Sequence, residues 1–505
     1  MVTTKVNHPS LADRREAGAQ ARSNTPPDSH TGWKPAADRP DPVALLEEQN
    51  LTREVDLVPV RHGRMTVSPF TFYRGAAKVM ASDLAATPTA GLTVQLCGDA
   101  HLSNFGAFAS PERKLLFDLN DFDETLPGPF EYDVKRMAAS FTIAARNNGL
   151  TPAEGKAAAQ AAVRSYRTAM AEFAEMRVMD LWYTQLSEDD LRAALLNMSS
   201  RKPVKSIDKL DKVEKVEKKA GAKDKKGSKA DKAAKSPEAK ALKAAEKNLA
   251  KAHTRDSLQA LSKLGEQVDG QYRIVSLPPL VIPGRELGAT FGMSELEAEK
   301  TVHGQFRKYR TTLQDDRRQL LERFEIVDFA RKVVGVGSVG TRAFIVLLQG
   351  RDQQDPLFLQ VKEATRSVLE DHLPKSRFTN PGERVVQGQR IMQAASDIYL
   401  GWTKGVQSDR YYYWRQLRDM KASAIVEAMS GFVLSFYAEL CGWTLARAHA
   451  RSGDAAAITA YLGDDEGFDQ SIADFSVRYA DQNEQDYQAL ADAIRTGRVP
   501  SVDGI

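Results

Sequence analysis

The sequence is poor in cysteine and in long apolar runs. Its 505 residues include only two cysteines, Cys97 and Cys441, which argues against a disulfide framework and fits a reducing compartment. It shows no Cys/His spacing of the zinc-binding kind. It has no apolar stretch of the roughly eighteen residues that a membrane span needs, and its first residues lack the apolar core of a secretory signal. We therefore expect a cytoplasmic protein without a membrane partner.

Three common catalytic motifs are also missing. The sequence contains no nucleophile elbow, no HExxH and no P-loop lysine, which argues against the enzyme classes built on them. It has no internal repeat, so a solenoid is not indicated. Its composition, 42% hydrophobic and 27% charged, is that of an ordinary globular protein, and its length suggests two or three structural units.

Charge is distributed unevenly along the chain. The net charge is +3, yet residues 201–251 alone carry +10, so the remainder is acidic. We expect a solvated, low-complexity Lys/Ala-rich insert over residues 201–253, because this segment has little apolar surface to bury. The alternative is a weak electrostatic tether to nucleic acid, although the segment has no aromatic residue for base stacking.

The remaining sequence predicts an α+β protein in several parts. Residues 1–40 are rich in Pro, Ser, Asp and Arg without periodicity, so we expect a disordered arm. Helical and strand patterns then divide the chain into a first half, a helical connector, a strand-rich second half and C-terminal helices, at residues 41–200, 254–323, 324–420 and 421–505. A long apolar helix is expected from Ala424 to Ala450.

The stretch "GDAHLSNFGAF" places an Asp, a His and an Asn in one short loop between two expected strands. Phosphoryl transfer from ATP needs an Asp to orient the attacking hydroxyl, together with an Asn and an Asp to hold Mg²⁺ on the phosphates. Asp99 and Asn104 have the five-residue spacing of kinase catalytic loops. We therefore expect Asp99 to position the acceptor and Asn104 to bind metal. His101 is either a second catalytic-loop residue that orients the backbone or a buried histidine satisfied by its neighbours.

A second acidic stretch, "FDLNDFDET", follows the loop and contains Asp118, Asp121 and Asp123. One of these carboxylates is expected to be the second metal ligand. Asp121 is the first choice and Asp118 the second. The alternative is a capped turn that precedes a helix.

The stretch "GVGSVG" places glycines at Gly335, Gly337 and Gly340. In a dinucleotide fold this motif opens a helix, but here the strand-forming residues 344–348 follow. Strand, glycine turn and strand are typical of the phosphate-covering hairpin of kinases.

The next expected strand, "FLQVKEA", offers Lys362 to the phosphates. A lysine within an apolar strand should pair with a carboxylate, and Glu383 on the following helix is the first candidate, with Glu363 and Glu370 as alternatives. The other interpretation is an ordinary β-hairpin with Lys362 on its solvent-exposed face.

These motifs resemble those of known phosphotransferases. "GDAHLSNFG" resembles the G-D-x-H-x-x-N catalytic loop of aminoglycoside phosphotransferases and choline kinases, and "NDFDE" resembles their metal-binding I-D-F-D-D stretch. "FEYDVKRMA" is similar to the start of the helix that carries a structural Asp in those families, here Asp133. The resemblance implies a two-lobed, protein-kinase-like core that uses ATP and Mg²⁺.

A closer resemblance covers residues 40–460. The stretches "FYRGAA", "GDAHLSNFG", "FDLNDFDET", "DVKRMAAS", "VGVGSVGTR", "QVKEA", "GQRIMQAASD" and "RQLRDMK" together resemble the bacterial family catalogued as domain of unknown function 2252. That family is uncharacterised, so this resemblance implies no activity.

The order of the motifs departs from that of kinases, because Asp99 precedes the glycine turn and Lys362. A circular permutation would account for this order and would place the helix of residues 424–450 beneath the catalytic loop. A dimer that shares its sites is the alternative. Three arginines close to the first half of the site, Arg61, Arg64 and Arg74, either clamp an anionic substrate or pair with the acidic stretch.

Taken together, these features predict an ATP- and Mg²⁺-dependent phosphotransferase that acts on a small-molecule or protein hydroxyl. The alternatives are a nucleotide-binding pseudoenzyme and a metal-dependent hydrolase built on the residues from Asp99 to Asp123.

Overall fold

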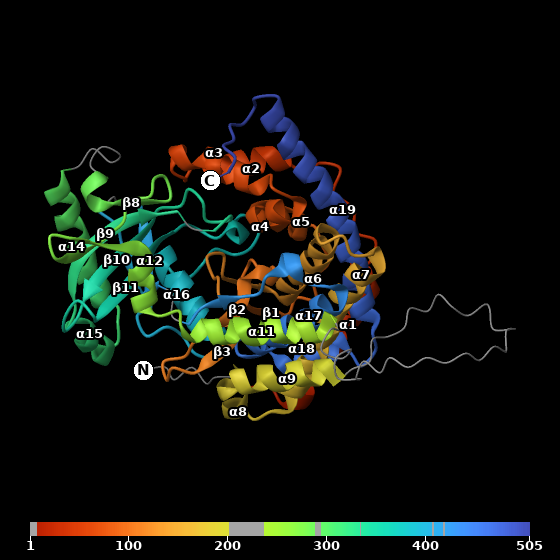
Figure 1. Ribbon diagram of the computed structural model, residues 1–505. Coiled ribbons are helices and arrows are strands. Elements are labelled where there is room, and N and C mark those ends of the chain that lie inside the picture. Colours follow the sequence, from red (N-terminus) through yellow and green to blue (C-terminus); the bar gives the residue numbers. More distant parts are fainter. Residues whose placement is uncertain are drawn as a thin grey trace, which may run out of the picture.

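The computed structural model describes residues 8–200, 237–287, 294–333, 335–406, 409–417 and 420–504. Within these ranges it has the expected α+β architecture, in which one part is mainly helical and the other is built on an antiparallel sheet (Figure 1). None of the helices in these ranges is long and apolar enough to cross a bilayer.

The larger sheet has the strand order β12-β13-β11-β10-β9-β8, and all neighbouring strands are antiparallel. Lys362 on β11 lies between Ala343 on β10 and Tyr413 on β13. The strands are β8 (Val281–Pro283), β9 (Glu325–Lys332), β10 (Ala343–Gln349), β11 (Pro356–Ala364), β12 (Gly401–Lys404) and β13 (Tyr411–Gln416).

Side chains of this sheet alternate between two cores. Leu359 and Val361 pack with α14 (Glu295–Arg310) and α15 (Asp315–Leu321). Phe358 and Ile345 pack on the opposite face with α12 (Ser257–Leu264). Because side chains two apart share a face, Lys362 points to the same side as Phe358.

Smaller sheets lie in the helical part and beside the connector. The strands flanking the loop of Asp99 are β1 (Thr93–Leu96) and β2 (Phe105–Ala109). One four-stranded sheet has the order β14-β2-β3-β5, and the pairs β1-β4 and β6-β7 form separate sheets. The remaining bounds are β3 (Leu115–Leu119), β4 (Leu126–Pro129), β5 (Leu186–Ser187), β6 (Gly265–Val268), β7 (Gln271–Ile274) and β14 (Ala422–Ser423).

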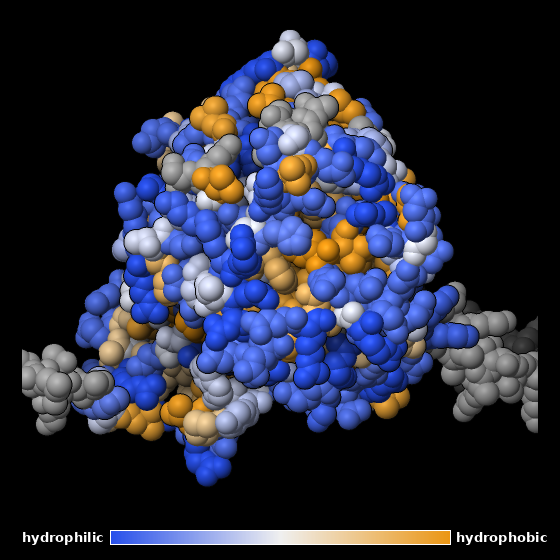
Figure 2. Space-filling view, turned by 90° about the vertical axis from the view of Figure 1, so that its left-hand side faces the viewer, coloured by the Kyte–Doolittle hydropathy of each residue, from blue (hydrophilic) through white to orange (hydrophobic). Residues whose placement is uncertain are grey.

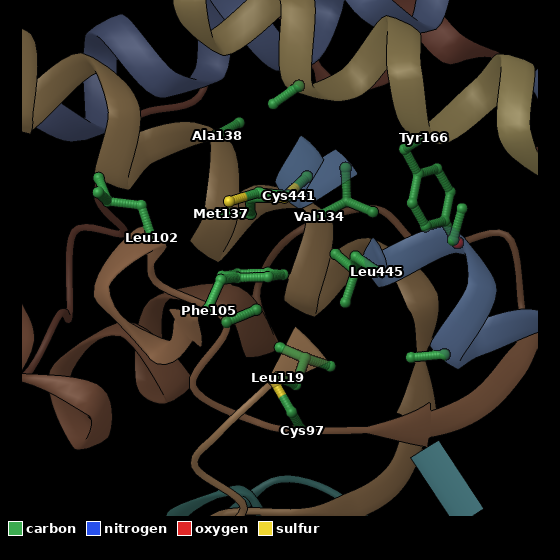
Figure 3. Packing of buried hydrophobic residues seen from close by; sticks show 14 of the residues in the cluster. Cys97, Leu102, Phe105, Leu119, Val134, Met137, Ala138, Tyr166, Cys441 and Leu445 are labelled. Atoms are coloured by element: carbon green, nitrogen blue, oxygen red, sulfur yellow. The ribbon is translucent and has the colours of Figure 1, made fainter. Parts of the chain in front are cut away.

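The main core lies among long helices that pack on the loop of Asp99. Leu102 and Phe105 of this loop pack with Met137, Cys441 and Leu445 (Figure 3). The long apolar helix begins later than expected and is α17 (Gly431–Ala450). It packs on α7 (Pro152–Glu175) and α6 (Phe130–Asn147), and α18 (Ala455–Leu462) and α19 (Gly467–Arg495) pack on α7 as well. The other α-helices outside the sheet cores are α1 (Leu11–Asn24), α2 (Pro42–Asn50), α3 (Val58–Met65), α4 (Pro69–Gly75), α5 (Ala77–Ala85), α8 (Val178–Tyr183), α9 (Glu188–Ser200), α11 (Pro237–His253) and α16 (Pro381–Met392).

The N-terminal arm is not disordered over residues 8–40, which corrects the expectation for that range; residues 1–7 lie outside the described ranges. Helix α1 packs on α18, and His30 Nε2 lies 2.8 Å from the hydroxyl of Tyr461. Arg39 forms ion pairs with Asp83 and Asp486. The partners of the arm come mostly from the far end of the chain, so the local sequence pattern gave no sign of this packing.

The Lys-rich insert and the connector are also corrected in part. Residues 237–253 of the insert form α11, whose Leu249 and Ala252 are buried in the main core. These two apolar residues share one helix face because they are three apart. The expected insert over residues 201–236 lies outside the described ranges. The connector, expected to be helical, also supplies the β6–β7 hairpin and strand β8 of the larger sheet.

Candidate functional site

A polar cavity of about 100 Å³ lies where the two halves of the chain meet, well above the ~10–15 Å³ that one water needs. The loop of Asp99, the acidic stretch after it and the glycine turn all contribute to this cavity. One chain therefore brings the two motif halves together, and a dimer is not needed to do so. The lining residues are Gln49, Arg74, Gly75, Ala77, Asp99, His101, Asn104, Asp121, Asp123, Glu124 and Gly335–Ser338.

The backbone before Asp99 is held by a carboxylate of α6. Oxygens of Asp133 accept hydrogen bonds from the backbone N–H groups of Cys97, at 2.7 Å, and Gly98, at 3.0 Å. His449 Nε2 lies 3.2 Å from the same carboxylate. Gly98 has φ +83°, and a Cβ there would lie 2.2 Å from the carbonyl oxygen of Glu124. Glycine is therefore required where the chain turns out of β1 into the loop.

Asp99 is fixed by both charge and burial. Its Oδ1 accepts a hydrogen bond from Arg136 Nε at 2.7 Å, and its backbone carbonyl accepts one from Asn104 Nδ2 at 2.8 Å. Burial raises the pKa of Asp99 to about 6, although Arg136 acts in the opposite direction. A carboxylate with this pKa is ionised at pH 7 and still basic enough to accept a proton.

His101 orients the loop. Its Nδ1 accepts a hydrogen bond from the backbone N–H of Ser103 at 3.2 Å and so caps the short turn Leu102–Asn104. Its Nε2 lies 3.8 Å from Oδ2 of Asp99. Burial lowers the pKa of His101 well below its usual value, so the imidazole is neutral at pH 7.

The acidic stretch separates into two groups. Asp121 and Asp123 line the cavity. Asp118, the second choice for a metal ligand, instead forms a buried ion pair with Arg447 and accepts a hydrogen bond from the backbone N–H of Ala394 at 2.9 Å. The structure thus places Asp118 outside the cavity, in a structural contact.

Asp121 is the better-placed candidate for a metal ligand. The cations of Lys362 and Arg415 lower its pKa despite its burial. Among the described residues, no group of three or more His, Cys, Asp or Glu side chains could hold a metal ion unaided. Mg²⁺ in a phosphate site usually takes only one or two carboxylates and completes its shell with phosphate oxygens and water. Asn104 and Asp121 both line the cavity, and their oxygens are of the kind that would suit a metal bound together with a phosphate.

Lys362 on the larger sheet forms an ion pair with Asp123, which lines the cavity and lies 239 residues away in sequence. The hydroxyl of Tyr413 on the adjacent strand donates to the other oxygen of Asp123 at 2.9 Å. Lys362 is therefore not a solvent-exposed lysine of an isolated hairpin: only 3% of its side chain is exposed.

The expected pair between Lys362 and Glu383 is not formed. Glu383 lies in the first turn of α16, and the residue of this helix that reaches the site is Arg384, which donates to the backbone carbonyls of Asp123 and Thr125. The two alternatives are also engaged elsewhere. Glu363 pairs with Arg342 and Arg410, and Glu370 lies 3.9 Å from Arg384. Glu363 does not pair with Lys362 because successive side chains of a strand point to opposite faces of the sheet.

The glycine turn between β9 and β10 is held against the first half of the chain. Arg53 donates to the carbonyls of Val339 and Gly337, at 2.5 Å and 3.0 Å, and the backbone N–H of Glu54 donates to the carbonyl of Gly340 at 2.7 Å. Gly335 and Gly337 line the cavity, whereas Gly340 has φ +86° and lies against Arg53.

Several residues of the site were not predicted. Glu124 lines the cavity, and burial raises its pKa to about 7. Lys421 lies close enough to Asp121 to interact with it, and burial lowers the pKa of Lys421 to about 8. Glu124 could have been found, because it belongs to the acidic stretch. Gln49 lies in the short helix α2, and only the fold brings it to the cavity.

A larger cavity of about 280 Å³ lies on the other face of the six-stranded sheet, beneath α14. Its lining is mainly apolar, and both of its arginines, Arg342 and Arg410, pair with Glu363. Apolar residues are visible among hydrophilic ones on the side of the molecule that carries this sheet (Figure 2). This cavity offers volume but no carboxylates for metal or proton transfer, so the polar cavity is the candidate site.

Fold and site together define an α+β protein with a polar cavity between a glycine turn and a loop rich in Asp, His and Asn. The family described as "Uncharacterized protein conserved in bacteria (DUF2252)" matches residues 53–235 and 207–493, and the chain belongs to this family. No curated protein matches the chain. No solved structure matches it either.

Proposed function

We propose that the protein is an ATP- and Mg²⁺-dependent phosphotransferase that acts on a hydroxyl group, built on a kinase-like core in circularly permuted order. One observation carries this proposal. Lys362 from the strand-rich half is paired with Asp123, and Asp123 lines one cavity together with Asp99, Asn104, Asp121 and the glycine turn. These are the groups that phosphoryl transfer requires, at one place.

The order of elements in the strand-rich half supports the proposal. A glycine turn joins β9 to β10, the lysine lies on the next strand, β11, and helix α16 follows. Protein kinases use the same succession of glycine loop, lysine strand and helix to hold the phosphates. One difference is that α16 presents Arg384 rather than a glutamate, so the lysine takes its carboxylate from the acidic stretch instead.

Contacts between β1 and the turn that follows α17 support the permutation. The backbone N–H of Gln95 donates to the Ser452 hydroxyl at 2.9 Å, and a Cβ on Gly453 would lie 2.6 Å from a methyl group of Val94. The hydroxyl of Tyr437 donates to the carbonyls of Leu102 and Phe105, so α17 lies beneath the loop of Asp99. Passing from the strand-rich half through α17 directly into β1 restores the kinase order of motifs.

The proposed roles follow from position. Asp99 accepts the proton of the attacking hydroxyl, with its orientation set by Arg136 and its loop held by Asp133. Asn104 and Asp121 would hold Mg²⁺, which neutralises the phosphates when bound. Lys362 exchanges Asp123 for a phosphate oxygen, while the glycine turn covers the phosphates.

The test compares wild type with Asp99→Asn and Lys362→Met, using the unfolding temperature in ATP and Mg²⁺ and the formation of ADP from ATP. We expect ATP to stabilise wild type and Asp99→Asn, with turnover in wild type alone. Lys362→Met should lose both responses. Stabilisation of wild type without turnover would instead indicate a nucleotide-binding pseudoenzyme. Full turnover by Lys362→Met would indicate a hydrolase that uses only the acidic residues.

A further inference from the structure

Three arginines beside the polar cavity lack a carboxylate partner. Arg53, Arg61 and Arg74 form no ion pair with any residue that the structure describes, and each has a buried Nε without a hydrogen-bond partner there. Burial lowers the pKa of Arg74, and the same cause lowers that of Arg53 to about 10. Removing a cation from water without a counter-ion is unfavourable, so this arrangement favours the binding of an anion.

Arg74 is the arginine that lines the cavity. Within the described ranges its side chain has no hydrogen bond, and it lies 5.9 Å from the ring centre of Phe70. Gly75, which ends α4, and Ala77, which begins α5, also line the cavity. The sequence left open whether Arg74 pairs with the acidic stretch, and the structure contains no such pair.

Arg61 lies behind this wall and orients a second donor. Its two terminal nitrogens donate to Asn50 Oδ1, to the carbonyl of Gly75 and to Gln49 Oε1, the last at 2.7 Å. Because the amide oxygen of Gln49 is engaged by Arg61, its NH₂ group is the part left to donate. Gln49 lines the cavity together with Arg74.

The four carboxylates that line the cavity are compensated by other groups. Glu124 accepts a hydrogen bond from the backbone N–H of Val368 at 2.7 Å and lies in the field of Arg384. Asp99 is paired with Arg136, and Asp123 with Lys362. Asp121 lies in the field of Lys362 and Arg415. Arg74 interacts only over longer distances with Glu427, the larger of its two attractions, and with Asp99, and burial outweighs both. The charge on this wall that lacks an ion pair is therefore positive.

We propose that Arg74 and Gln49 form an oxyanion subsite that takes a phosphate-sized anion. Under the proposed function, on which this assignment rests, that anion is either the terminal phosphate of the nucleotide or an anionic group on the acceptor. Guanidinium and amide N–H groups are suited to both, because they donate to adjacent oxygens of one phosphate or carboxylate. Arg74 is thereby a residue that contacts the reacting molecules rather than part of the fold.

The first experiment measures pyrophosphate binding by calorimetry and the unfolding temperature of the ligand-free protein, for wild type, Arg74→Met and Arg74→Lys. Arg74→Met should bind pyrophosphate at least about tenfold more weakly, and its ligand-free form should unfold at the same or a higher temperature, because an uncompensated cation has been removed. Arg74→Lys should recover part of the affinity. A purely structural arginine would instead show a lower unfolding temperature with unchanged pyrophosphate affinity.

Arg146→Met is the matched control, since Arg146 lies on the surface of α6 and pairs with Asp481. It should keep the pyrophosphate affinity of wild type. Equal affinity in wild type and Arg74→Met, or no binding by wild type, would overturn the subsite.

A second comparison, of ADP with a non-hydrolysable ATP analogue, identifies the source of the anion. If Arg74 holds the terminal phosphate, Arg74→Met should weaken the analogue and leave ADP unchanged. If Arg74 holds the anionic group of the acceptor, Arg74→Met should bind ADP and the analogue as tightly as wild type does, but should bind pyrophosphate more weakly. Arg74-dependent pyrophosphate binding without any nucleotide binding would keep the subsite and refute the phosphotransferase. Normal turnover and normal pyrophosphate binding by Arg74→Met would refute the subsite and keep the phosphotransferase.

Discussion

At the scale of single residues, Asp99 shows how burial and pairing can balance. Arg136 favours the charged carboxylate, and burial favours the neutral acid. Burial is the larger effect, so the pKa of Asp99 rises to about 6 rather than falling. The neutral His101 beside it does not titrate in this range, because burial lowers its pKa well below the usual value.

This balance predicts the pH dependence of the proposed reaction. Asp99 must be ionised to accept a proton, so kcat/KM should rise with pH through about 6 and level off above 7. At pH 5 the ionised fraction, and with it the rate, should be about tenfold below the plateau. A pH–rate profile of ATP turnover measures this directly.

Glu124 supplies the control for that profile, because its pKa is also raised, to about 7, by burial in the same cavity. In the Glu124→Gln variant, kcat/KM should still rise with pH through about 6. Loss of this rise in kcat/KM in the Glu124→Gln variant would assign the titration to Glu124 and not to Asp99.

At the scale of elements, the site depends on how two loops are held. Asp133 at the start of α6 accepts two backbone N–H groups of the loop before Asp99. The glycine turn is held through backbone carbonyls by Arg53 and through Gly340. Both loops are fixed by contacts far apart in sequence, which makes their stability testable separately from catalysis.

Asp133→Ala should destabilise the protein by about 3–5 kcal/mol, because it leaves two buried N–H groups without acceptors at roughly 1–3 kcal/mol each. Urea denaturation gives the free energy of unfolding. Asp180→Ala, at an exposed residue paired with Arg177, should cost less than about 1 kcal/mol. A similar loss in both variants would contradict the anchoring role of Asp133.

Two glycines of the turn should respond differently to substitution. Gly340→Ala should cost about 1–3 kcal/mol, because φ is +86° and the added Cβ would meet the side chain of Arg53 at 3.0 Å. Gly335→Ala should leave the free energy of unfolding nearly unchanged, because nothing lies within 4 Å of its added Cβ. Equal denaturation midpoints for the two variants would show that the turn is not held as described.

At the scale of the whole molecule, the N-terminal arm joins segments from both ends of the chain. Trp33 packs against Phe475 and Tyr479 of α19, and Arg39 pairs with Asp83 of α5 and Asp486 of α19. The arm therefore belongs to the folded body, although its composition predicts disorder.

Arg39→Met should destabilise the protein by about 3–5 kcal/mol, because it leaves two buried carboxylates, each 4% exposed, without their cation. Arg15→Met is the matched control in the same arm, since Arg15 and Glu175 are both exposed and their pair should contribute at most about 1 kcal/mol. Chemical denaturation of both variants tests the arm. Wild-type stability of Arg39→Met would restore the expectation of a disordered arm.

Local chemistry in the sequence pointed to the loop of Asp99 and the glycine turn, because their residue types and spacing are those that a phosphate and metal site would need. It also predicted most of the strands and helices near them, since periodic burial is a local property. Pairing is not local. The sequence offered three glutamates for Lys362, and the structure pairs it with Asp123, because the packing of β11 against the acidic stretch decides which carboxylate is near.

The same distinction holds for the rest of the molecule. The sequence by itself determined the α+β class, the membership of its family and the identity of the groups able to carry chemistry. Only the tertiary structure decided that the two halves meet in one chain, that Asp118 is held by Arg447 outside the cavity, and that Arg74 faces the cavity without a described partner. These depend on which distant surfaces bury one another, and a charge is paired or left unpaired only once that packing is complete.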